Sequence, residues 1–136
     1  MKLELRRTVS AAPARVWRAL TAPGELAAWF WPERLSPAAA ADLRVGGRYR
    51  ISGDGLAVTG EYRVVDEPSR LEFTWQWEGD SEVTVVAIEL CPVAGGTGTE
   101  IVIVHTGHSD ETTTGNHAQG WADCLGRLPA WLETTP

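Results

Sequence analysis

The sequence predicts an α+β domain in which a curved antiparallel sheet wraps around a long C-terminal helix, with two short helices after the first strand. Three observations predict this fold class. Apolar and polar residues alternate in successive segments between residues 43 and 106, which is typical of strands with one buried face. The turns between these segments are short, which favours antiparallel neighbours. After residue 110 the apolar spacing becomes helical.

The N-terminal part predicts one strand and two short helices. Residues 1–9 alternate in the manner of a half-buried strand. Pro13 suits the first position of a helix, and the apolar residues after it recur at helical spacing. Pro23 repeats this signal, and Pro32 ends the second helix. We interpret the four alanines at residues 38–41 as a connector or as part of a helical turn.

The middle of the chain predicts five or six antiparallel strands. The clearest alternation covers residues 71–77, where large apolar residues occupy every second position. Asp54-Gly55 is a hairpin signal, and the glycine pair at 46–47 indicates a bulge or bend. The parity of the arginines at positions 44, 48, 50 and 63 assigns them to the solvent-facing side of the sheet.

The last helix is predicted to begin near Glu111. Its apolar stripe is formed by Trp121, Leu125, Leu128 and Leu132, which fall within an arc of about 60° at about 100° per residue. His117 lies at the edge of this stripe. Pro129 would remove one hydrogen bond from a continuous helix and clash with the preceding turn, so we expect a kink or a break there.

Length and charge limit the classes of partner. The chain has 136 residues, which is the size of one domain, and no linker divides residues 1–136. Its net charge is −6, with 12 basic and 18 acidic residues, so we expect no nucleic-acid partner. No apolar segment approaches the roughly 20 residues that cross a bilayer, and no export signal follows Met1. We therefore expect no membrane partner and a cytoplasmic location.

A curved sheet wrapped on one helix tends to leave a cavity between them, and seven tryptophans are available to line it. Buried indole N–H groups need a hydrogen-bond partner, which a pocket supplies more easily than a dry core does. The alternative interpretation is that the aromatic residues of the sheet pack in the core. For the aromatic run at 29–31, the alternative is a dimer contact. The expected ligand-binding residues are Phe73, Trp75 and Trp77 on the sheet, His105, His117 and Trp121 near or on the last helix, and Trp29 and Phe30 as a gate.

Three histidines lie close to the start of the last helix. His105 and His108 have the short spacing of metal ligands, but one lies at a strand end and the other in a turn, so their rings need not converge. The chain also lacks a His-Glu-x-x-His or paired-cysteine motif, and we predict no metal site and no other cofactor. His105 and His117 are candidate polar anchors or catalytic acid–base groups, and structural histidines with satisfied hydrogen bonds are the alternative.

Six short motifs occur in order along nearly the whole chain. They are residues 12–21 (APARVWRALT), Leu26 with Trp29, residues 42–49 (DLRVGGRY), Pro68–Leu71 with Thr74 and Trp75, Gly95–Thr97 leading to His105 and Gly107, and His117 with Gly120, Trp121 and Leu125. By these motifs the chain resembles the heat-shock-protein ATPase activator homologues of the START-like (SRPBCC) superfamily. The resemblance implies the helix-grip fold, which is the architecture that the patterns predict.

The resemblance leaves the function open, because the superfamily includes lipid and hormone binders and polyketide cyclases. Our preferred hypothesis is an intracellular protein that binds a small hydrophobic or aromatic ligand in the cavity. One alternative is a cyclase/aromatase-like or hydrolase-like enzyme with His105 or His117 as its general base. Another is a stress-related or chaperone-interaction module, and a homodimer through exposed aromatic residues stays open as well.

Overall fold

The computed structural model describes residues 1–134 and arranges them as one seven-stranded sheet with three α-helices. The strands are β1 (Lys2–Val9), β2 (Ala38–Ala41), β3 (Arg48–Gly53), β4 (Leu56–Asp66), β5 (Arg70–Trp77), β6 (Thr84–Val93) and β7 (Gly98–Thr106). The helices are α1 (Pro13–Thr21), α2 (Pro23–Trp29) and α3 (Glu111–Thr134), and the 3-10 turns are η1 (Glu33–Leu35) and η2 (Ala94–Gly96).

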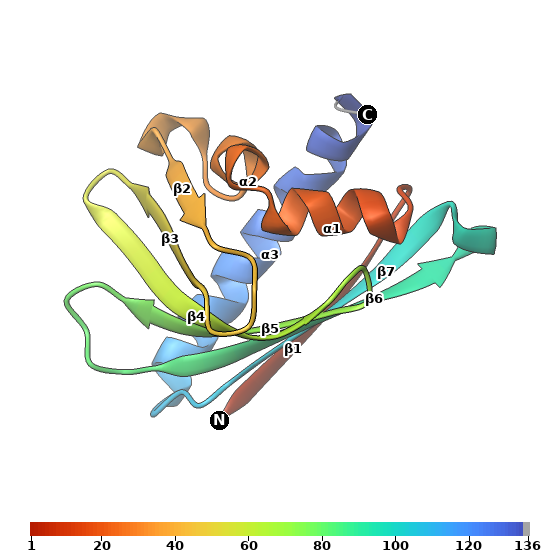
Figure 1. Cartoon of the computed structure of the whole chain (residues 1–136). Helices are drawn as coiled ribbons and strands as arrows, with labels where there is room; N and C mark the ends of the chain where they lie inside the picture. Colours follow the sequence, from red (N-terminus) through yellow and green to blue (C-terminus); the bar gives the residue numbers. More distant parts are fainter. Residues whose placement is uncertain (135–136) are drawn as a thin grey trace.

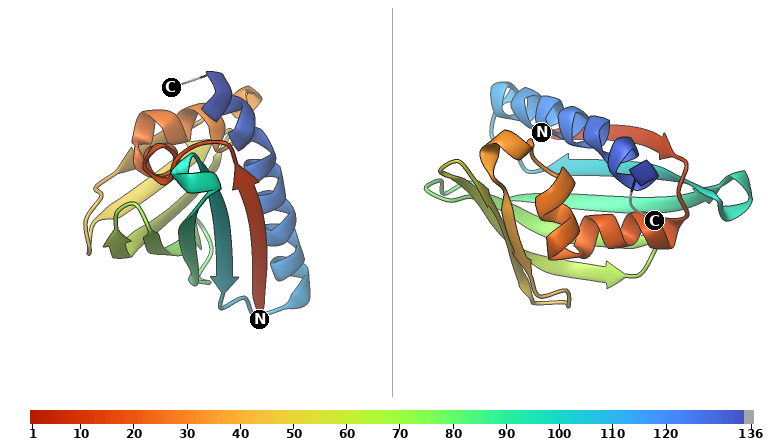
Figure 2. Two further views of the ribbon diagram at one scale, coloured as in Figure 1. Left: turned by 90° about the vertical axis from the view of Figure 1, so that its right-hand side faces the viewer. Right: turned by 90° about the horizontal axis from the view of Figure 1, so that it is seen from above.

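The sheet has the order β1-β7-β6-β5-β4-β3-β2, and all neighbouring strands are antiparallel. It curves strongly, and the three helices lie on its concave side (Figure 1 and Figure 2). Helix α3 packs against β1, at one edge of the sheet, and also contacts α1 and α2. The fold class predicted from the sequence is therefore confirmed as a helix-grip fold.

The core lies between the concave face of the sheet and the helices. Alternate residues of β5 show the pattern, because Leu71, Phe73 and Trp75 are all at least nine-tenths buried. The stripe of α3 faces the same core through Trp121 and Leu125. The arginines assigned to the solvent-facing side of the sheet, at positions 44, 48, 50 and 63, are all exposed. Three of them lie on β3 and β4, whereas Arg44 lies in the loop between β2 and β3 and not in the sheet.

One local prediction is wrong, and of the two outcomes expected at Pro129, a kink or a break, the break does not occur. Residues 38–41 form β2, which pairs with β3 along its whole length; four alanines give no apolar alternation from which a strand could be recognised. Helix α3 does not end at Pro129 but continues to Thr134. The turn around this proline is held from both sides, since Leu128 is fully buried and Trp131 is bonded to Glu25.

Among residues 1–134, no helix is both long and apolar enough to cross a membrane.

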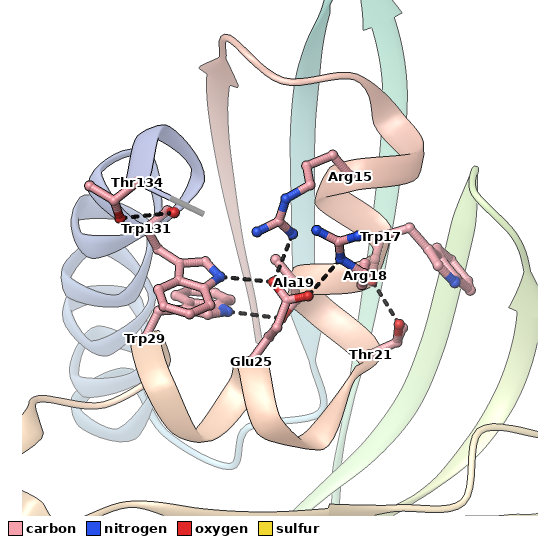
Figure 3. A network of polar contacts seen from close by, with 9 residues as sticks. All are labelled: Arg15, Trp17, Arg18, Ala19, Thr21, Glu25, Trp29, Trp131 and Thr134. Carbon is pink, nitrogen blue, oxygen red and sulfur yellow. Dashed lines mark hydrogen bonds and ion pairs between the residues drawn. The ribbon is translucent and has the colours of Figure 1, made fainter. Parts of the chain in front are cut away.

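Glu25 links the three helices at the C-terminal end of α3 (Figure 3). Its carboxylate accepts hydrogen bonds from Arg15 and Arg18, both at 2.7 Å, and from Trp131 Nε1 at 2.9 Å. The side chains of Arg15 and Glu25 are only 14% and 15% exposed. Burial alone would raise the pKa of Glu25, but the hydrogen bonds from Trp131 and Arg15 outweigh burial, and the pKa lies below its ordinary value.

Replacing Glu25→Gln should lower the free energy of unfolding by about 2 kcal/mol, because two guanidinium groups lose a charged partner that is shielded from water. Urea denaturation followed by circular dichroism measures this change. The control is Glu4→Gln, whose carboxylate pairs with Arg6 in an exposed position and should change the free energy by less than about 0.5 kcal/mol. Equal effects of the two substitutions would contradict the proposed link.

Candidate ligand-binding site

A groove opens between the end of β5, helix α3 and the segment of residues 30–35 that follows α2. Its volume is about 270 Å³. The aromatic residues in its wall are Phe30, Trp31, Trp75, Trp77, His117 and Trp121. Polar side chains reach it from the η1 turn and from α3, namely Arg34, Asn116, Asp123 and Arg127. We call this hollow the α3 groove.

Parallel rings form one wall of the α3 groove. The rings of Trp31 and Trp77 are stacked with an interplanar angle of 8° and centroids 6.0 Å apart. His117 lies beside Trp77 in nearly the same plane, at 15° and 6.2 Å, because the in-plane N–H of the indole donates to it edge to edge. Trp75 lies nearly perpendicular to Trp77, at 87° and 5.5 Å. The wall therefore offers flat apolar surface, which suits a planar ligand.

The interior between sheet and helices is narrower than the sequence suggested. A second cavity there, lined by Phe30, Phe73, Trp75 and Trp121 among others, has a volume of about 20 Å³. Such a volume holds about one water molecule. Phe30, Trp75 and Trp121 line both this cavity and the α3 groove. The space for a ligand accordingly lies at the groove, on the outer side of these three rings.

Trp75 has an unsatisfied polar group at this shared wall. Its side chain is only 5% exposed, and its Nε1–H has no hydrogen-bond partner among the described residues. A buried donor without an acceptor costs about 1–3 kcal/mol. An acceptor atom on a bound molecule would remove this cost.

His117 belongs to a hydrogen-bonded chain that begins at the groove. Trp77 Nε1 donates to His117 Nε2 at 2.9 Å, so this nitrogen carries the lone pair. The proton of neutral His117 is then on Nδ1, which lies 2.6 Å from His108 Nε2 and donates to it. His108 in turn carries its proton on Nδ1, which is buried and unpaired within residues 1–134.

His105 forms a second chain of the same kind deeper in the core, where it is fully buried. Trp121 Nε1 donates to His105 Nδ1 at 3.0 Å, which leaves the proton on Nε2. This Nε2–H donates to Thr84 Oγ1 at 2.6 Å, and the Thr84 hydroxyl donates to the Trp75 carbonyl at 3.2 Å. Every polar atom of His105 is therefore satisfied, as the structural interpretation of this residue requires.

The three histidines converge, contrary to the expectation for His105 and His108. The ring centroids of these two residues lie 4.3 Å apart, and one ligand atom from each of His105, His108 and His117 lies within 4.8 Å of the others. In the chains described above, however, each unprotonated nitrogen accepts a hydrogen bond. The rings of His105 and His117 are also stacked at 24°, so their in-plane lone pairs do not meet at one point. This set of donors would bind a metal ion only after the indole hydrogen bonds were broken.

Burial lowers the pKa of all three histidines. For His105, burial and the neighbouring His108 and His117 lower the pKa to about 3. Burial is also the main cause for His117, again assisted by His108. For His108, burial outweighs the carboxylate of Glu82, which acts in the opposite direction. The cluster is therefore neutral near pH 7, and the lone pair of His117 is engaged by Trp77, so His117 is not free to act as a general base towards the groove.

The predicted site residues divide into three groups. Trp75, Trp77, His117, Trp121 and Phe30 meet at the α3 groove. Phe73 lines only the interior cavity, and His105 lies behind the groove in the core. Trp29 does not line the groove, since it is buried and donates from Nε1 to the Ala19 carbonyl at 2.8 Å. Cys124, which also lines the groove, is a buried thiol, and burial raises its pKa to about 12.

Sequence reasoning did not assign several residues of the site. Trp31, Arg34 and Arg127 line the groove, and His108 joins the histidine chain. The run of three aromatic residues at 29–31 was a usable signal, since it required at least one exposed ring, and that ring is the half-buried Trp31.

A curved seven-stranded sheet that holds a long C-terminal helix, with a hollow beside that helix, defines a START-like domain. Residues 10–133 match the profile of the family described as Activator of Hsp90 ATPase homolog 1-like protein. The chain belongs to this family. No curated protein matches the sequence.

Solved structures share the fold over almost the whole chain. Protein CV1439 from Chromobacterium violaceum is 31% identical, with a TM-score of 0.82 and coverage of 97% of this chain and 96% of that chain. DynU16, described as a protein of the dynemicin biosynthetic locus, is 27% identical with a TM-score of 0.85, over 98% of this chain and 47% of that chain. PFC0360w, an HSP90 activator from Plasmodium falciparum, is 18% identical with a TM-score of 0.82, over 98% and 96%; this likeness shows the fold alone.

Acidification below about pH 6.5 should destabilise the fold through the histidine cluster. The unfolded chain protonates its histidines near pH 6.5, whereas folded His105 stays neutral down to about pH 3. The unfolded state then binds more protons, so the free energy of unfolding falls with falling pH, by about 1.4 kcal/mol per pH unit for each such histidine. Urea denaturation between pH 5 and pH 7 measures this slope.

The variant His105→Gln separates this effect from the titration of other groups. The Gln amide can accept from Trp121 and donate to Thr84, as the imidazole does, but it does not titrate. Between pH 5 and pH 6 the slope for the variant should be smaller than for the original chain by about 1 kcal/mol per pH unit. An unchanged slope would show that His105 titrates normally in the folded protein.

Proposed function

We propose that this protein binds a small, planar, largely apolar molecule with a hydrogen-bond acceptor in the α3 groove. The observation that carries the proposal is Trp75, whose ring lines the groove and whose Nε1–H is buried without a partner among the described residues. The stacked rings of Trp31 and Trp77 supply flat apolar surface beside it. Removal of this surface from water provides the driving force, and the indole N–H sets the orientation of the ligand.

The volume of the groove limits the size of the ligand. Ligand sites of drug-sized molecules have about 300–1,000 Å³, and the groove, at about 270 Å³, falls at the lower limit. It suits a molecule of one or two fused rings better than a lipid chain. With about twelve heavy atoms at about 0.5 kcal/mol each, such a ligand would bind with a Kd of roughly 50 µM.

Binding is favoured over catalysis because the histidine at the groove, His117, has no free ring nitrogen to act as a base. Both ring nitrogens of His117 are engaged, one by Trp77 and the other by His108. A chaperone-related role has the family description as its support. The groove itself points to a small molecule, and we therefore propose ligand binding as the function of this site.

The proposal is tested by isothermal titration calorimetry with 2-naphthamide, a neutral bicyclic probe with a carbonyl acceptor. We expect a Kd of tens of micromolar, weakened at least tenfold by Trp31→Ala, which removes one of the two stacked rings. The matched control is Trp131→Ala, which removes another half-buried tryptophan outside the groove. Binding weaker than millimolar to the original chain, or equal losses in the two variants, would overturn the proposal.

The role of the indole N–H is tested by Trp75→Phe, which keeps an aromatic ring but removes the donor. Loss of one neutral hydrogen bond should weaken 2-naphthamide about three- to tenfold. Binding of 2-methylnaphthalene, which has no acceptor, should change much less. If both probes weaken equally, Trp75 contributes ring surface and not a hydrogen bond.

A further inference from the structure

The charges around the α3 groove differ from those of the chain as a whole. The protein has a net charge of −6, yet the groove is lined by two arginines, Arg34 and Arg127, and one carboxylate, Asp123. The local balance is therefore positive inside an acidic protein. A positive site of this kind attracts an anionic ligand.

Arg127 already has a structural role. Its Nη2 donates to the Phe30 carbonyl at 2.7 Å and its Nε to the Trp29 carbonyl at 3.2 Å. These carbonyls are at the C-terminal end of α2, where the helix leaves acceptors unpaired. Arg127 therefore fixes the segment that carries Phe30 and Trp31, and most of its hydrogen-bonding capacity is used.

Arg34 differs from Arg127 in this respect. It is exposed on the η1 turn and lines the groove. None of the described side chains forms a hydrogen bond or an ion pair that would neutralise the charge of Arg34. Several other arginines form an ion pair with a carboxylate, as Arg50 does with Glu78. Asp123, across the groove on α3, accepts a hydrogen bond from Gln119 at 3.0 Å.

We propose that the ligand of the α3 groove is a planar aromatic anion, such as an aromatic carboxylate, whose charged group pairs with Arg34. This inference rests on the proposed function and adds the chemical class of the ligand. The ring system lies against Trp31 and Trp77, and the carboxylate meets the guanidinium at the rim. The planar fork of a guanidinium matches a carboxylate in geometry as well as in charge.

The expected size of the preference for an anionic probe follows from the solvent exposure of Arg34. Arg34 is accessible to solvent, so an ion pair with it is worth no more than an exposed pair. An anionic probe should therefore bind about fivefold tighter than a neutral probe of the same shape at low salt. Salt at about 0.5 M should reduce this preference, because exposed charges are screened.

The test compares 2-naphthoate with its neutral isostere 2-naphthamide by calorimetry at pH 7.5. The original chain should prefer the acid about fivefold, and Arg34→Gln should abolish that preference by weakening the acid more than the amide. The control Arg63→Gln removes an exposed arginine of β4 outside the groove and should keep the preference. Asp123→Asn removes the opposing carboxylate and should strengthen the acid about twofold.

The outcomes separate the two proposals. If both probes bind equally well and Arg34→Gln changes neither, the anionic class is wrong and the proposed function stands. A preference for the amide, or a preference for the acid that survives Arg34→Gln, also overturns the inference. If neither probe binds better than millimolar, the proposed function fails, and the assignment of an anionic ligand fails with it.

Discussion

The structure depends on the need of buried indole N–H groups for acceptors. Two of these groups join helix α3 to the sheet, because Trp121 of α3 donates to His105 of β7 and Trp77 of β5 donates to His117 of α3. Apolar packing alone would tolerate small rotations of the helix, whereas these bonds require particular nitrogens to face each other. The orientation of α3, and with it the far wall of the groove, follows from them.

The same bonds determine which chemistry is available at the site. A histidine that accepts from an indole must present an unprotonated nitrogen, so the network requires neutral imidazoles, and burial lowers their pKa in the same direction. Once His117 is committed to Trp77 and His108, it offers no lone pair to a molecule in the groove. What remains at the groove is flat aromatic surface, the N–H of Trp75 and the charge of Arg34.

Patterns within single elements made most of the fold predictable. Every second residue of β5 points to one face, so the positions of Phe73, Trp75 and Trp77 indicated a common wall, and two of these residues do line the groove. Strand β2 was hidden because alanine has no strong preference for either face. The meeting of His105 and His108 was not predictable from spacing, since it depends on how the loop between β7 and α3 turns. The volume of the interior depends on how side chains from several elements pack together, and sequence patterns carry no information on it.

The small volume of the interior cavity indicates on which side of Phe30, Trp75 and Trp121 a ligand would bind. Phe30, Trp75 and Trp121 separate it from the groove, and Phe30 packs edge-on against Trp29 and Trp121, with centroids at 5.5 and 5.6 Å. A ligand that entered the interior would have to displace Phe30, and each aromatic pair broken by this movement costs about 0.5–1.5 kcal/mol beyond the buried area. Arg127 adds resistance, because it holds the Phe30 carbonyl. A molecule seated on the groove side meets none of these costs and gains the stacked rings, so the groove is where binding is least opposed.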